Sequence, residues 1–163
     1  WPVAHGLSGN RELGTGHGMA ESDVDRLLLI VVGAHLRAEI ADRPLGYRLH
    51  EAVQNQLHQH SGDTDWPLLP IVCTDVWVLN HDELQERPAI AIGGPGVNAL
   101  SGYLYQRLPT ALAIENQLVI QMDLGFDDHR VAIWGFDAGH TVSAVELFER
   151  KYLREYLRAL GAL

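Results

Sequence analysis

The sequence predicts a three-layer, Rossmann-like α/β domain, with a mainly parallel central sheet and an antiparallel hairpin at its edge. Three patterns predict it: short, continuously apolar runs, helical repeats between them, and a hairpin pattern near residues 111–124. Continuously apolar runs are typical of parallel strands that helices cover on both faces. At 163 residues, of which 47% are hydrophobic, the chain is long enough for one such core.

The expected domain covers residues 25–163. The preceding segment, residues 1–24, is rich in Gly and polar residues without a period, which predicts a flexible or extended arm. The first strand is the apolar run 26–32. Pro44 then opens a helix, because its missing N–H costs nothing in a first turn, and apolar residues follow at helical spacing as far as Leu57.

The second strand covers residues 68–74. Residues 76–80 either extend this strand or pack over it. Residues 80–87 fit one short helical turn, which Pro88 stops.

The third strand is the run 89–92, and Asn98 caps the helix that follows and that Pro109 ends. The hairpin turns at Glu115 and Asn116, and another strand covers residues 129–135. The last helix is expected from residue 140 to 160, with an apolar stripe made of Val145, Phe148, Tyr152, Leu153, Tyr156 and Leu157.

Composition excludes several classes of function. The net charge of −9, with only 12 Lys and Arg, argues against nucleic-acid binding. The longest apolar run, residues 27–32, is far too short to span a bilayer. The single cysteine, Cys73, excludes an internal disulfide and a cysteine-based zinc site, and slightly favours the cytoplasm. The histidines fit solvent-facing or capping positions, so we expect no metal site, and no motif identifies a cofactor.

In an open parallel sheet, ligands bind beyond the carboxyl ends of the strands. Four segments follow those ends, and each contains Gly or a small polar side chain. They are residues 33–35, 74–75, 93–98 and 135–141. We therefore expect them to gather at one rim.

The segment Gly93–Asn98, "GGPGVN", joins a strand to a helix. Its glycines allow the backbone to approach a ligand closely, and free N–H groups at the helix start favour an anion. Ser101 adds a hydroxyl in the first turn. The segment matches neither the dinucleotide fingerprint nor the phosphate loop, and a sharp turn closed by an Asn cap is the alternative.

Acids and histidines supply the other candidates. Asp137 either caps the last helix or reaches with His140 toward the same cleft as a general-base pair. Asp75 is either a cap or a site carboxylate, and Cys73 is either a buried hydrophobe or a thiol nucleophile. The candidate ligand-binding residues are Gly93, Gly94, Gly96, Asn98, Ser101, Asp75, Asp137, His140 and His35.

The runs "AIAIGGPGVNALSGYL" and "RVAIWGFDAGHTVSAVELF" resemble a module of archaeal surface-layer-type proteins. The residues that carry this resemblance lie in the C-terminal half and are Gly93, Gly94, Pro95, Asn98, Gly135, Asp137, Thr141 and Ala144. The resemblance implies an α/β unit whose glycine turns are architectural and have a part in assembly. It does not imply catalysis.

Three functions follow as hypotheses. The first is a non-catalytic domain that binds a small polar or anionic molecule, or a partner's polar segment, at the strand ends. The second is a self-associating, surface-assembly module, which would form homo-oligomers. The third is a hydrolase or transferase that uses Asp75 or Cys73 with His35 or His140.

Overall fold

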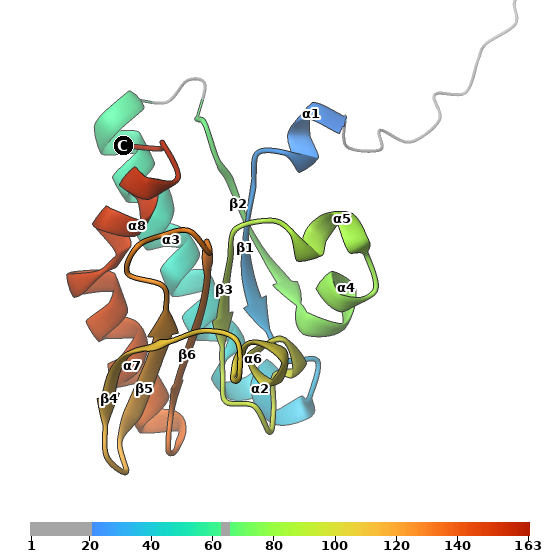
Figure 1. Ribbon diagram of the computed structural model, residues 1–163, viewed down its shortest axis with the longest axis vertical. Coiled ribbons are helices and arrows are strands. Elements are labelled where there is room, and N and C mark those ends of the chain that lie inside the picture. Colours follow the sequence, from blue (N-terminus) through green and yellow to red (C-terminus); the bar gives the residue numbers. More distant parts are fainter. Residues whose placement is uncertain (1–20, 63–65) are drawn as a thin grey trace, which may run out of the picture.

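The computed structural model describes residues 21–62 and 66–163, and these form a three-layer α/β domain (Figure 1). Its single sheet has the strand order β2-β1-β3-β6-β5-β4. The strands are β1 (Leu27–Val32), β2 (Leu69–Thr74), β3 (Ala89–Ile92), β4 (Thr110–Ile114), β5 (Leu118–Met122) and β6 (Arg130–Gly135). The first four strands in that spatial order are parallel, and β5 and β4 continue the sheet antiparallel. The predicted fold class, including the hairpin at the edge, is confirmed.

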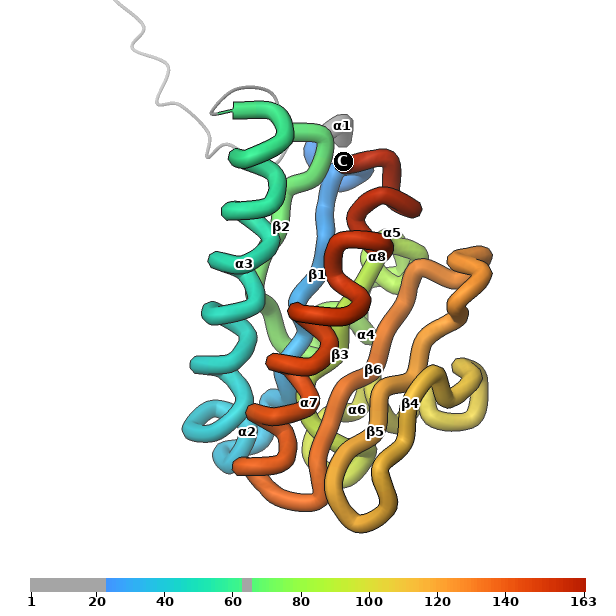
Figure 2. The backbone as a smooth tube through the Cα atoms, turned by 90° about the vertical axis from the view of Figure 1, so that its left-hand side faces the viewer, coloured from blue at the N-terminus to red at the C-terminus, as the bar shows by residue number. Residues whose placement is uncertain are grey.

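Helices cover both faces of the sheet. One face carries the long helices α3 (Arg43–Ser61) and α7 (Ala138–Lys151) and the shorter α8 (Leu153–Ala159), as Figure 2 shows. The other face carries the short helices α4 (Asp75–Leu79), α5 (Asp82–Gln85) and α6 (Ala99–Leu104). Two further short helices, α1 (Glu21–Val24) and α2 (Leu36–Ala41), flank β1 in the sequence. Helix α1 lies inside the predicted arm, and the rest of that arm, residues 1–20, is outside the described residues.

The core explains the apolar runs. All six residues of β1 are buried, because alternate side chains enter the hydrophobic clusters on the two faces of the sheet. The predicted stripe of the last helix is buried in the cluster that α3, α7 and α8 share. The helix itself breaks at Tyr152, so α7 and α8 replace the single helix that was expected over residues 140–160.

The residues after β2 follow one of the two alternatives that the sequence left open. Residues 75–79 form helix α4, which packs over the sheet instead of extending the strand, and Thr74 caps it through a hydrogen bond from the amide of Trp77. One element, helix α2, was not predicted; it has only six residues, and of these only Ala38 is buried.

Other predictions about single residues are confirmed. Pro44 stands in the first turn of α3, and Asn98 caps α6. The hairpin turns through Asn116, whose φ is 56°. Among the described residues, no helix has both the length and the apolar composition needed to cross a bilayer.

The topology places a crevice between β1 and β3. These strands are neighbours, yet β1 leads through α2 to α3 on one face, whereas β3 leads to α6 on the opposite face. Chain segments that leave adjacent strands toward opposite faces open a cleft beyond the carboxyl ends, where ligands of open α/β sheets bind.

Candidate functional site

The loop that follows β3 is built around Gly93 and Asn98. Gly93 has φ of 102°, and a Cβ at this position would lie 2.7 Å from Oδ2 of Asp42, so only glycine fits without a shift. The carbonyl of Gly94 accepts hydrogen bonds from the amides of Val97 and Asn98, both at 3.0 Å. The loop therefore closes on itself and leaves the glycine backbone facing the crevice.

Asn98 closes this loop from the inside. Its Nδ2 donates to the carbonyls of Val31 (3.0 Å) and Ile92 (2.9 Å), and its Oδ1 accepts from the amides of Leu100 (3.0 Å) and Ser101 (3.2 Å). The side chain is fully buried, and these four bonds use all its hydrogen-bonding capacity. Asn98 thus ties β1, β3 and α6 together and is not available to a ligand.

Asp75 has a similar structural task. Its carboxylate accepts hydrogen bonds from the amides of Ala34 (2.8 Å), Val76 (2.8 Å) and Ala99 (2.6 Å). The three donors belong to the bend after β1, to α4 and to α6. Asp75 therefore connects three segments at the carboxyl edge of the sheet.

The β6–α7 connection is closed by local contacts. Asp137 is the N-cap of α7 and accepts from the amide of His140 at 2.8 Å, which is the main reason that its pKa lies below the usual value. Nδ1 of His140 lies 2.9 Å from Oδ1 of Asp137. Oγ1 of Thr141 accepts from the amide of Gly135 and donates to the carbonyl of Asp137, both at 3.0 Å. A Cβ at Gly135 would overlap the backbone of His140 and Thr141, so this bend requires glycine.

A cavity of about 450 Å³ lies where three segments meet: α2, the loop of residues 93–98 (the glycine loop) and the start of α7. Its wall contains four of the nine predicted ligand residues, namely Gly93, Gly94, Gly96 and Asp137. The other wall residues are Arg37, Ile40, Ala41, Asp42, Val97, Gly135, Phe136, Ala138 and Thr141. The bends after β3 and β6 and the segment after β1 thus share one hollow, at the edge where the crevice was expected.

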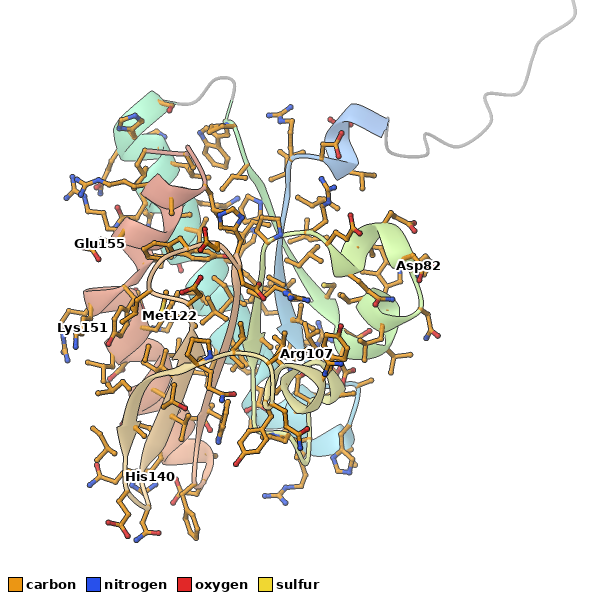
Figure 3. The ribbon with its side chains drawn as sticks, viewed as in Figure 1. Asp82, Arg107, Met122, His140, Lys151 and Glu155 are labelled. Carbon is orange, nitrogen blue, oxygen red and sulfur yellow. The ribbon has the colours of Figure 1, made fainter. Side chains whose placement is uncertain are left out.

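The other five predicted residues do not form the wall of this cavity. Asp75 and Asn98 are committed to backbone amides and carbonyls, and Ser101 is fully buried in α6. His35 is the N-cap of α2, where its Nδ1 accepts from the amide of Arg37 at 3.1 Å. His140 lies beside Asp137 at the start of α7 (Figure 3). The acid–base pair of the third hypothesis is therefore not assembled in the cavity.

Sequence reasoning missed one wall residue of the cavity, Asp42. It is only 6% exposed, its backbone joins α2 to α3, and it occupies the N-cap position of α3 without making the side-chain cap bond. Its carboxylate has no hydrogen bond or ion pair to any residue within 21–62 and 66–163. Burial raises its pKa to about 6, while the charge of Arg37 acts in the opposite direction. The only sequence signal was its place two residues before Pro44, where an N-cap is expected.

Two further features contrast with Asp42. A second hollow of about 450 Å³ lies between α3 and the pair α7 and α8, but both of its acidic side chains are partnered. Arg48 lies 2.8 Å from Glu146 and 3.3 Å from Glu149 there. Burial raises the pKa of Cys73 to about 12, so it is a thiol at neutral pH and not a ready nucleophile.

Comparison with protein-family models, with curated proteins and with solved structures gives no match. The resemblance to surface-layer-type modules therefore stays a prediction. The part of the chain that the structure describes holds no group of three or more His, Cys, Asp or Glu arranged to bind a metal ion.

Proposed function

We propose that the protein binds a small polar molecule in the cavity between α2, the glycine loop and the start of α7. One observation carries the proposal: Asp42 is only 6% exposed, it forms part of the cavity wall, and its carboxylate makes no hydrogen bond or ion pair with the described residues. A carboxylate that borders a hollow and is not used by the fold is available to a ligand there.

The glycine loop supports the same proposal. The amide groups of Gly94 and Gly96 donate to no acceptor in the described residues, and both glycines are part of the cavity wall. Backbone donors next to the first turn of the 14-residue helix α7 suit an acceptor or an anionic group of the ligand.

The test is a thermal-shift screen of the full chain against nucleotides, sugar phosphates, carboxylates and amines, followed by Kd measurements for any compound that raises Tm. The substitution Gly96→Val is the most selective variant, because a Cβ at Gly96 meets nothing within 4 Å and the side chain enters the hollow. We expect binding to fall at least tenfold while Tm stays within a few degrees.

Gly94→Val is less informative, since a Cβ there would already lie 3.4 Å from the ring of Trp134. Ala113→Val, on the exposed edge strand β4, is the matched control for added volume. A screen without a single hit, or full affinity in Gly96→Val, would reject the proposed function.

A second candidate function is self-association through β4. This strand ends the sheet, and its five residues, "TALAI", include no charge and no proline to discourage pairing. Sedimentation over a hundredfold concentration range tests this: a dimer that Ala113→Lys abolishes supports it, and a monomer at every concentration rejects it.

A further inference from the structure

The charges of the cavity favour a cation over an anion. Three of its wall residues are charged, and two of them, Asp42 and Asp137, are acidic, against one Arg37. Arg37 is exposed, whereas Asp42 is buried and packs against Gly93. An anion beside Asp42 would therefore meet a like charge in a poorly solvated place.

The start of α7 does not reverse this preference. Asp137 already places a carboxylate on the first turn, where it accepts from the amide of His140. The helix dipole is thus partly compensated by the protein itself. The amides of Gly94 and Gly96 need only an acceptor, which a hydroxyl, a carbonyl or a water molecule supplies as well as an anion does.

The mouth of the same cavity is apolar. Ile40 on α2 is 74% exposed and Phe136 after β6 is 79% exposed, and both are wall residues of the cavity. A ligand with an apolar body would cover these exposed apolar side chains when it binds. The ring of Phe136 also attracts a cation that passes its face.

We propose that the ligand is a small organic cation: an ammonium group that pairs with the carboxylate of Asp42, carried on an apolar or aromatic body that lies between Ile40 and Phe136. This inference rests on the proposed function and names the ligand class of that site. A neutral hydroxyl offers Asp42 a hydrogen bond but no opposite charge, so it binds more weakly than an ammonium group. The net charge of −9 also favours the approach of cations.

The experiment compares three probes with one phenyl body and different heads: 2-phenylethylamine, 2-phenylethanol and 3-phenylpropanoate. Their Kd values are measured on the full chain at pH 7.5 by calorimetry or by chemical shifts. We expect the amine to bind at least tenfold more tightly than the alcohol, and the carboxylate most weakly. Asp42→Asn should lower amine affinity at least tenfold, to that of the alcohol. Phe136→Ala should weaken the amine and the alcohol alike.

Asp82→Asn is the matched control, because it removes the same charge from an exposed position on α5, well away from His140 and the start of α7 (Figure 3). It should leave all three affinities within twofold. An alcohol or carboxylate that binds as tightly as the amine, or an unchanged amine affinity in Asp42→Asn, overturns the inference. If the amine does not bind, but a compound of another class binds and loses affinity in Gly96→Val, the result rejects only this inference. If no compound binds at all, the proposed function falls with it.

Discussion

The substitution Asp42→Asn removes the charge of the cavity carboxylate while nearly keeping its size. Because this carboxylate makes no hydrogen bond or ion pair with the described chain, the substitution breaks no contact. The substitution therefore changes the free energy of unfolding mainly through electrostatics. The raised pKa of Asp42 gives the size and the direction of this change.

The pKa of Asp42 is about 6 in the folded protein, against an ordinary value of 3.8. The folded state therefore binds the proton more tightly than the unfolded state does. The stability from this group is fully present below pH 3.8 and is lost as the pH rises through 6. The loss at pH 7 is about 3 kcal/mol, at about 1.4 kcal/mol per pH unit. This is an upper limit, because water can enter the cavity beside the carboxylate.

We expect Asp42→Asn to be more stable than the wild type at pH 7, by up to about 3 kcal/mol, or about 6–12 °C in Tm for a domain of this size. The gain should shrink steadily between pH 6 and pH 4 and vanish below it. Urea unfolding followed by circular dichroism at pH 4, 5, 6 and 7 measures this, with Asp82→Asn as the control for net charge. A variant less stable than the wild type at pH 7, or a difference that does not change with pH, would refute the reasoning.

Two further predictions concern the residues that close the bends. Asn98→Ala removes four buried hydrogen bonds and leaves the amides of Leu100 and Ser101 without their acceptor, so we expect a loss of about 2–4 kcal/mol in urea unfolding. A loss below about 1 kcal/mol would show that water replaces the side chain. Gly135→Ala and Gly96→Ala form a matched pair: the first forces the backbone at Thr141 to move and should cost about 1–3 kcal/mol, whereas the second meets nothing and should stay within about 0.5 kcal/mol. Equal Tm values for these two variants would contradict the packing at Gly135.

The fold could be predicted where local pattern and burial agree. The run of β1 is apolar because both of its faces are buried, and Asn98 was recognisable as a cap because capping depends on residues close in sequence. Local pattern left α4 undecided, because its Val and Trp favour strands, whereas the Thr74 cap and packing on the sheet make it a helix. Helix α2 was missed because it has only six residues: Leu36 and Ile40 are four positions apart, but two apolar residues are too few to show a helical period.

The site was only partly predictable for a related reason. The glycines of the loop were found because a strand–glycine–helix junction is visible in the sequence, and Gly93, Gly94 and Gly96 do line the cavity. Asp42 was missed because its burial depends on Gly93, which lies 51 positions away in the chain. Once α2 was overlooked, nothing indicated that the start of α3 faces the crevice.

The hydrogen bonds of a polar side chain at the end of a parallel sheet indicate whether it has a structural role or is a candidate for function. Asp75, Asn98 and Asp42 illustrate the difference. Every bend there leaves backbone amides and carbonyls without partners, so most polar side chains are used to satisfy them, as Asp75 and Asn98 are. A polar side chain that satisfies none of them and is still buried lowers the stability of the fold, as Asp42 does at neutral pH. Substitutions at the two kinds of residue should therefore change stability in opposite directions: Asn98→Ala lowers it and Asp42→Asn raises it. Only the second should impair binding of the proposed ligand without impairing folding, because on our proposal that ligand supplies the partner that the described chain does not.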